Sequence, residues 1–70
     1  MSVQQARIDH WNITLRPQSE VALPWRADAE NTTNLFEHDF ATGFTRADAL
    51  TNLCRKLRID AQTTLRAFEL

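Results

Sequence analysis

The segment from Thr45 to Leu57 constrains the fold of this chain more than any other. Thr45 is a residue type that caps the free amides at the start of a helix, and Asp48 follows it at the capping-box position. Apolar residues then recur at helical spacing, at Ala47, Leu50, Leu53, Cys54 and Leu57. This pattern predicts one amphipathic helix, against which the rest of the chain must pack.

Three segments before the helix alternate polar and apolar residues with period two, which is typical of half-buried strands. They span residues 9–16, 21–27 and 35–40. Pro24 has no amide to donate, which places the second strand at an edge or a bulge, and the polar residues 28–32 predict a loop. Gly43 precedes the helix cap, where we expect a turn conformation closed to other residues.

The last residues of the chain fit two structures. Ala61, Leu65 and Phe68 share a helical face, whereas residues 63–68 are rich in strand formers. A last strand would complete a small antiparallel sheet packed on one helix. We therefore expect one α+β domain over residues 1–70, of order β-β-β-α-β, with a flexible N-terminus at 1–6. The alternative is N-terminal strands followed by a C-terminal helix-turn-helix.

Seventy residues allow one domain, whose core must form without a covalent staple. Cys54 is the single cysteine, and we expect it to be buried on the helix stripe. The remaining core is expected from the larger apolar residues, which are Trp11, Ile13, Leu15, Val21, Leu23, Trp25, Leu35, Phe36, Phe40 and Phe44.

The chain shows no pattern typical of an enzyme, a metal protein or a membrane protein. No nucleophile lies in a pattern with a base and an orienting group, and we expect no cofactor. His10 and His38 have acidic neighbours, but neighbours along a strand point to the opposite side, so outer-face polar positions are expected. The sequence contains neither a membrane-spanning run nor a secretory signal, which predicts a cytoplasmic protein.

Charge is distributed unevenly along the chain. The net charge is −1, but residues 1–45 hold three arginines and six acids, while residues 46–70 hold five bases and three acids. An acidic segment beside an exposed tryptophan favours docking to a basic protein surface. We predict a small non-enzymatic regulator, inhibitor or accessory subunit, in a format that suits phages or mobile elements. The expected contacts with a protein partner are Trp25, Asp28, Glu30, Glu37 and Asp39.

Residues 53–68 resemble a helix-turn-helix unit. Asp60 would cap the second helix, and Arg58 stands where this motif usually has glycine, in a left-handed conformation. The resemblance implies a DNA-binding transcriptional regulator with contacts at Arg55, Arg58, Gln62, Thr63 and Arg66. A third hypothesis is a homodimer that is closed by an edge strand.

Overall fold

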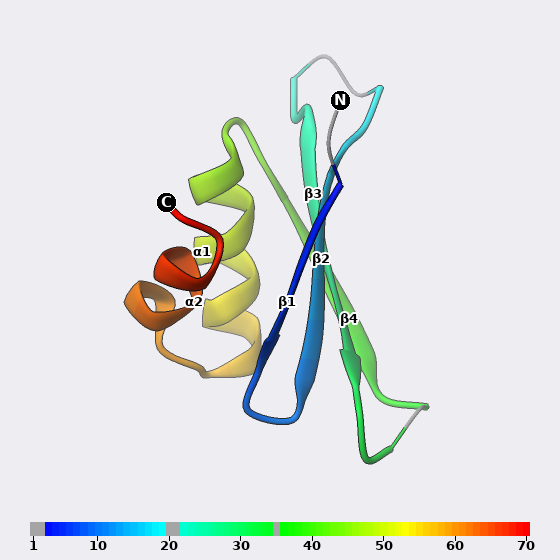
Figure 1. The fold of residues 1–70 in the computed structure, drawn as a ribbon. Coiled ribbons are helices and arrows are strands. Elements are labelled where there is room, and N and C mark those ends of the chain that lie inside the picture. Colours follow the sequence, from blue (N-terminus) through cyan, green and yellow to red (C-terminus); the bar gives the residue numbers. More distant parts are fainter. Residues whose placement is uncertain (1–2, 20–21, 35) are drawn as a thin grey trace.

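The computed structural model describes residues 3–19, 22–34 and 36–70. It contains a four-stranded antiparallel sheet whose spatial order follows the chain, made of β1 (Gln4–Ile8), β2 (Trp11–Pro17), β3 (Trp25–Asn31) and β4 (His38–Gly43). Two helices follow, α1 (Arg46–Leu57) and α2 (Ala61–Ala67), and both lie on the same side of the sheet (Figure 1). The fold is therefore α+β, as the sequence predicts. We call the covered side of the sheet the helix face and the uncovered side the open face.

The order of the elements corrects the expected β-β-β-α-β arrangement. The strand that the sequence expected at the C-terminus is absent from that end, and the additional strand is β1 near the N-terminus. β1 includes residues 4–6 of the segment expected to be flexible. Asp9 takes a φ of 55° in the two-residue turn between β1 and β2, and aspartate tolerates this left-handed region better than most residues. The tail forms α2 rather than a strand, because the Asp60 carboxylate accepts the Thr63 amide at 2.9 Å and caps a helix. The alternative, N-terminal strands followed by a helix-turn-helix, fits the structure.

β3 is an interior strand, so the expectation of an edge or bulge at Pro24 is wrong. Pro24 lies just before the first residue of β3, and no position of β3 therefore lacks an amide. Residues 28–31, expected in a loop, continue the strand. β4 runs beyond the predicted end at residue 40, and Val21 and Leu35, at the predicted starts of two strands, lie outside the described residues.

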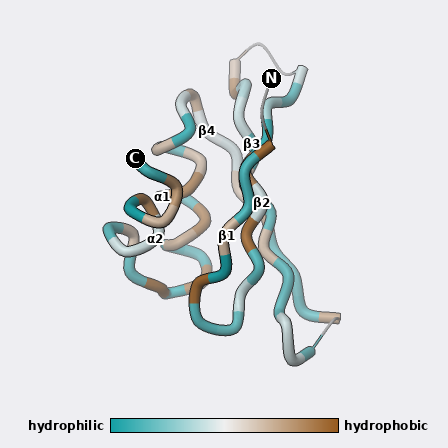
Figure 2. The backbone as a smooth tube through the Cα atoms, viewed as in Figure 1, coloured by the Kyte–Doolittle hydropathy of each residue, from teal (hydrophilic) through white to brown (hydrophobic). Residues whose placement is uncertain are grey.

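Small side chains on β3 and β4 allow α1 to lie close to the sheet. Ala27, Ala29 and Ala41 are buried on the helix face. Around them pack the fully buried side chains of β2 and α1, which are Ile13, Leu15, Leu50 and Leu53. No element is hydrophobic throughout, as Figure 2 shows, which agrees with a single two-layer core.

Gly43 is required by a close approach and not by a turn conformation, which corrects the expectation from sequence. No glycine in the structure has a positive φ. A Cβ atom at Gly43 would lie 2.7 Å from the carbonyl carbon of Asp48 and 2.8 Å from Cα of Ala49, and closer still to the Ala49 amide nitrogen. The end of β4 therefore contacts the first turn of α1 backbone to backbone.

Four large apolar residues that the sequence places in the core are exposed instead. Leu23 is 42% exposed, and Phe36, Phe40 and Phe44 are 96%, 44% and 68% exposed. Phe40 and His38 share one side of β4, as the alternation predicts. The other side bears Ala41 and Gly43, however, and α1 covers that side.

Candidate interaction surfaces

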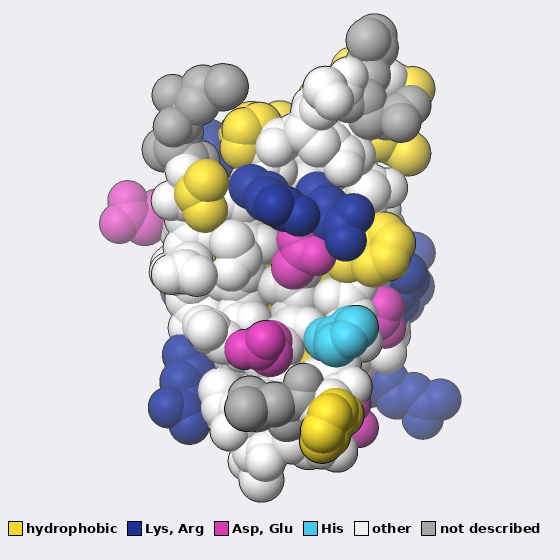
Figure 3. Space-filling model, turned by 90° about the vertical axis from the view of Figure 1, so that its right-hand side faces the viewer, with side chains coloured by type: hydrophobic (Ala, Val, Ile, Leu, Met, Phe, Trp, Pro, Cys, Tyr) yellow, Lys and Arg dark blue, Asp and Glu magenta, His cyan; other side chains and the backbone are white. Residues whose placement is uncertain are grey.

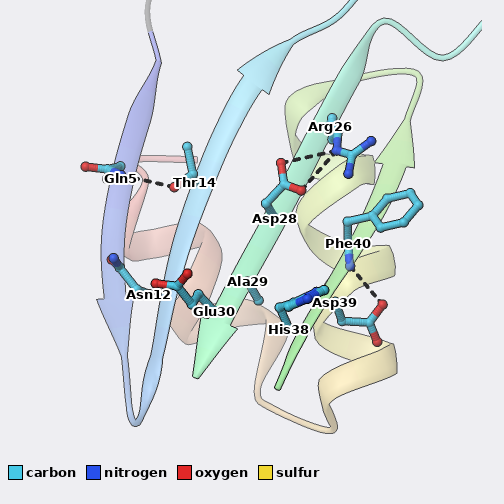
Figure 4. Close-up of a pocket in the computed structure, with 10 residues that line it drawn as sticks. All are labelled: Gln5, Asn12, Thr14, Arg26, Asp28, Ala29, Glu30, His38, Asp39 and Phe40. Carbon is cyan, nitrogen blue, oxygen red and sulfur yellow. Dashed lines mark hydrogen bonds and ion pairs between the residues drawn. The ribbon is translucent and has the colours of Figure 1, made fainter. Parts of the chain in front are cut away.

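The open face of the sheet forms a shallow hollow of about 540 Å³. Figure 3 shows this face, and Figure 4 shows that side chains from all four strands point into it. Most of the side chains that face it are polar or charged, as far as the described chain goes: Gln5, Asn12, Thr14, Arg26, Asp28, Glu30 and His38, with Phe40 at the β4 border.

Two arginines neutralise Asp28 in the upper part of this hollow. Arg16 Nε lies 3.3 Å from Asp28 Oδ2, and Arg26 Nε lies 3.0 Å from Oδ1 of the same carboxylate. About a third of the Asp28 side chain is exposed, so each pair contributes on the order of 0–1 kcal/mol to stability. Asp28 therefore does not present a free negative charge to a partner.

The other predicted acidic contacts are separated by the fold. Asp39 lies on the helix-face side of β4, with Lys56 Nζ at 3.8 Å. Glu37 Oε1 accepts a hydrogen bond from the buried Asn31 amide at 2.6 Å, an interaction within the β3–β4 connection. Glu30 is paired across the sheet with His38. The four acids therefore do not form one acidic surface, and their role in binding stays a prediction.

Neither tryptophan lies on the open face. Trp11 is buried on the helix face. Trp25 occupies the helix-face side of β3 and is half-buried, with the Arg46 guanidinium carbon 5.7 Å from its ring centroid. The predicted contact at Trp25 is therefore a partly covered position at the end of β3, next to the start of α1.

Three exposed phenylalanines occur at every fourth residue around β4, and we call them the phenylalanine row: Phe36 precedes the strand, Phe40 lies within it and Phe44 follows it. Phe40 is on the open-face side of β4, whereas Phe36 and Phe44 lie outside the strand, in the connections at its two ends. The guanidinium carbon of Arg26 lies 4.0 Å from the Phe40 ring centroid. Figure 3 shows separate hydrophobic groups among the polar and charged side chains of this face.

Sequence reasoning missed the phenylalanine row because it assigned large apolar residues to the core by size. The signal that could have found it is the alternation along β4 of small residues on one side with larger residues on the other. Ala41 and Gly43 leave space for a closely packed helix on one side, which leaves Phe40 on the other. Small residues at alternate positions of a strand can thus identify the covered face.

The five candidate DNA contacts are all exposed on the two helices and the turn between them, but they do not form one continuous surface. Gln62 and Arg66 line a small hollow on α2. Arg55 lies on the other flank of α1, where it lines a hollow with Phe40 of β4. Arg58 takes the left-handed conformation that the resemblance implies, with φ 59° and ψ 43°, and ends α1.

Thr63, the remaining candidate, is held by the helix cap. Its amide and its hydroxyl both donate to Asp60 Oδ2, at 2.9 and 2.6 Å. These bonds favour the ionised carboxylate and hold the pKa of Asp60 below its ordinary value. The N-terminus of α2 therefore presents a carboxylate, which is unfavourable beside a phosphate backbone.

Cys54 is buried, as predicted, and burial raises the pKa of its thiol. Among the described residues, no three His, Cys, Asp or Glu side chains are arranged to hold a metal ion. Neither α1 nor α2, the helices of the described chain, is long and apolar enough to span a membrane.

Comparison with known proteins gives no match to a protein-family model, to a curated protein sequence or to a solved structure.

Proposed function

We propose that this chain is a small, non-enzymatic cytoplasmic protein that binds a protein partner through the phenylalanine row, as a regulator, inhibitor or accessory subunit. The observation that carries the proposal is the exposure of Phe36, Phe40 and Phe44, within β4 and in the connections at its two ends. Clustered exposed apolar side chains are typical of interaction sites in soluble proteins.

The energetics of burial support this proposal. Removing one phenylalanine side chain from water contributes about 1.5–3 kcal/mol, a large fraction of the stability of a small domain. This chain has four phenylalanines and buries only Phe68 among them, at 3% exposure. Burial of the phenylalanine row against a partner would therefore contribute favourable free energy to binding.

The surroundings of Phe40 resemble the centre of an interface. Arg26 stacks on the ring, and Lys56 Nζ lies 5.3 Å from the ring centroid. Aromatic residues and arginine are the types most often found at energetically dominant positions of interfaces. Asp28 and Asp39 balance these bases, so the partner should offer an apolar groove with a rim of both charges.

Affinity capture with matched variants tests the proposal. The test variants are Phe36→Ser, Phe40→Ser and Phe44→Ser, and the control is Leu70→Ser, because Leu70 has the same 44% exposure as Phe40 but lies at the C-terminus. We expect a specific partner that is captured by the wild type and by the control, and whose affinity falls at least about tenfold when Phe40 is replaced. Retention of that partner by all three phenylalanine variants would contradict the proposal.

DNA binding is the second candidate function, favoured by the left-handed Arg58 between α1 and α2 and by the exposed Gln62 and Arg66. It predicts that the wild type binds duplex with an affinity that falls steeply with salt. Arg66→Ala should weaken binding, while Arg7→Ala on β1 serves as the control. No binding at low salt would rule this function out.

A further inference from the structure

The two edges of the sheet are protected unequally. β1 and β4 are the edge strands, and an edge strand presents backbone groups that lack partners within the sheet. On β4, however, Lys56 Nζ donates to the Phe40 carbonyl at 2.8 Å, and Asn52 Nδ2 donates to the Thr42 carbonyl at 3.0 Å. Side chains of α1 therefore cover two outward carbonyls of β4, those of Phe40 and Thr42.

The register of β1 shows which of its groups point outward. Ile8 pairs with Trp11 across a two-residue turn, and the closing pair of such a hairpin is a hydrogen-bonded pair. Hydrogen-bonded positions then recur at every second residue, so the peptide groups of Gln5 and Arg7 point away from β2. Outside the strand ladders, no hydrogen bond of the described residues uses the backbone N–H or C=O of Gln5 or Arg7.

We propose that β1 is a self-association edge, at which a second copy of this chain pairs antiparallel with β1 about a two-fold axis at Gln5. In this register Gln5 faces Gln5 of the second copy, and Val3 faces Arg7 of the second copy. The outward groups of residues 3, 5 and 7 on each strand can then form six backbone hydrogen bonds, by the alternation of an antiparallel ladder.

Side-chain chemistry favours this register over those with the axis further along β1, at Ala6 or Arg7. A glutamine amide is both donor and acceptor, so a Gln5 pair is complementary to itself. An axis at Arg7 would place two arginines directly opposite each other, and an axis at Ala6 would place them on the diagonal. Like charges at opposed positions are destabilising, whereas the axis at Gln5 keeps both arginines apart. β1 contains no acidic residue, so no register of the two strands is favoured by an ion pair between Arg7 and an acid of the other β1.

The proposed dimer would join two four-stranded sheets into one and leave both phenylalanine rows uncovered. β1 and β4 are opposite edges, so the rows would stand at the two outer borders. The dimer would thus be bivalent towards a partner of the phenylalanine row, although its formation does not depend on that function. A contact limited to one edge strand belongs to the class of small, weak interfaces, for which we expect a dissociation constant in the micromolar range or above.

Sedimentation equilibrium from about 10 µM to about 1 mM tests the proposal, in the range where weak dimers dissociate. The wild type is expected to rise from 8.1 kDa towards twice that mass. Gln5→Pro removes an outward amide without removing a β1–β2 hydrogen bond, and is expected to stay monomeric. Thr42→Pro is the matched control, because it removes an outward amide from β4, and it should dimerise like the wild type.

Amide hydrogen exchange on the unmodified chain gives a readout that does not depend on the folding of a variant. The Gln5 and Arg7 amides should exchange at least about tenfold more slowly at high than at low concentration, while the outward Thr42 amide is unchanged. A wild type that is monomeric throughout overturns the proposal. So does a dimer that persists in Gln5→Pro, or one that protects Thr42 instead of Gln5.

Discussion

Replacing Gly43 with alanine tests how closely α1 packs on the sheet, because two physical effects predict opposite signs. No glycine here has a positive φ, so alanine can adopt the backbone conformation of residue 43. If the site had space, the substitution would stabilise the protein by about 0.4–1 kcal/mol through a less flexible unfolded chain. The structure predicts destabilisation instead.

The expected magnitude follows from what the new methyl group would meet. It would lie 2.7 Å from the Asp48 carbonyl carbon and 2.8 Å from Ala49 Cα, which are backbone atoms that cannot rotate away. Relief requires the first turn of α1 to move from β4, and overpacking of this kind costs about 1–3 kcal/mol. A domain of 70 residues has about 4–10 kcal/mol of stability in total, so the loss is a large fraction of it.

Urea and thermal unfolding of Gly43→Ala against the wild type measure this effect. At 2 kcal/mol the melting temperature should fall by about 10 °C, given the usual scaling for a domain of this size. Thr42→Ala, at the neighbouring half-buried position, controls for a change in strand propensity and should stay close to the wild type. A Gly43→Ala variant as stable as the wild type, or more stable, would refute the close packing of α1 on β4.

Three further predictions concern the helix cap, the left-handed residue and the phenylalanines. The Asp60 carboxylate has a pKa below its ordinary value of 3.8 because Thr63 donates two hydrogen bonds to it, so its stabilisation is present above pH 3.8 and disappears as the pH falls through the lowered pKa. The stability difference between wild type and Asp60→Asn, measured by urea unfolding, should therefore shrink towards zero in strong acid. Arg58→Gly should raise stability by about 0.5–1 kcal/mol, because it relieves a left-handed non-glycine residue, and thermal unfolding at neutral pH would detect a failure to do so. Phe36→Ala should change stability by less than about 0.5 kcal/mol, whereas Phe68→Ala should cost about 3–5 kcal/mol; equal effects in urea unfolding would contradict the assignment of exposed and buried rings.

The elements that the sequence determined are those whose signals are local. Thr45 accepts the Asp48 amide at 3.1 Å and starts α1 where the capping pattern predicts. Trp11, Ile13 and Leu15 alternate with polar residues and are buried on β2 as expected. Caps and periodic burial depend on residues within a few positions of one another, so the sequence alone specifies them.

The tertiary structure alone decided which side of β4 is covered by α1, and that residues 4–8 near the N-terminus form a strand. Phe40 and Ala41 are adjacent, and only the packing of α1 against small residues determines that the alanine is buried and the phenylalanine is exposed. β1 has few apolar residues and becomes a strand because β2 lies beside it. Sequence determined each alternation, but the choice between its two sides depends on contacts between segments that are distant along the chain.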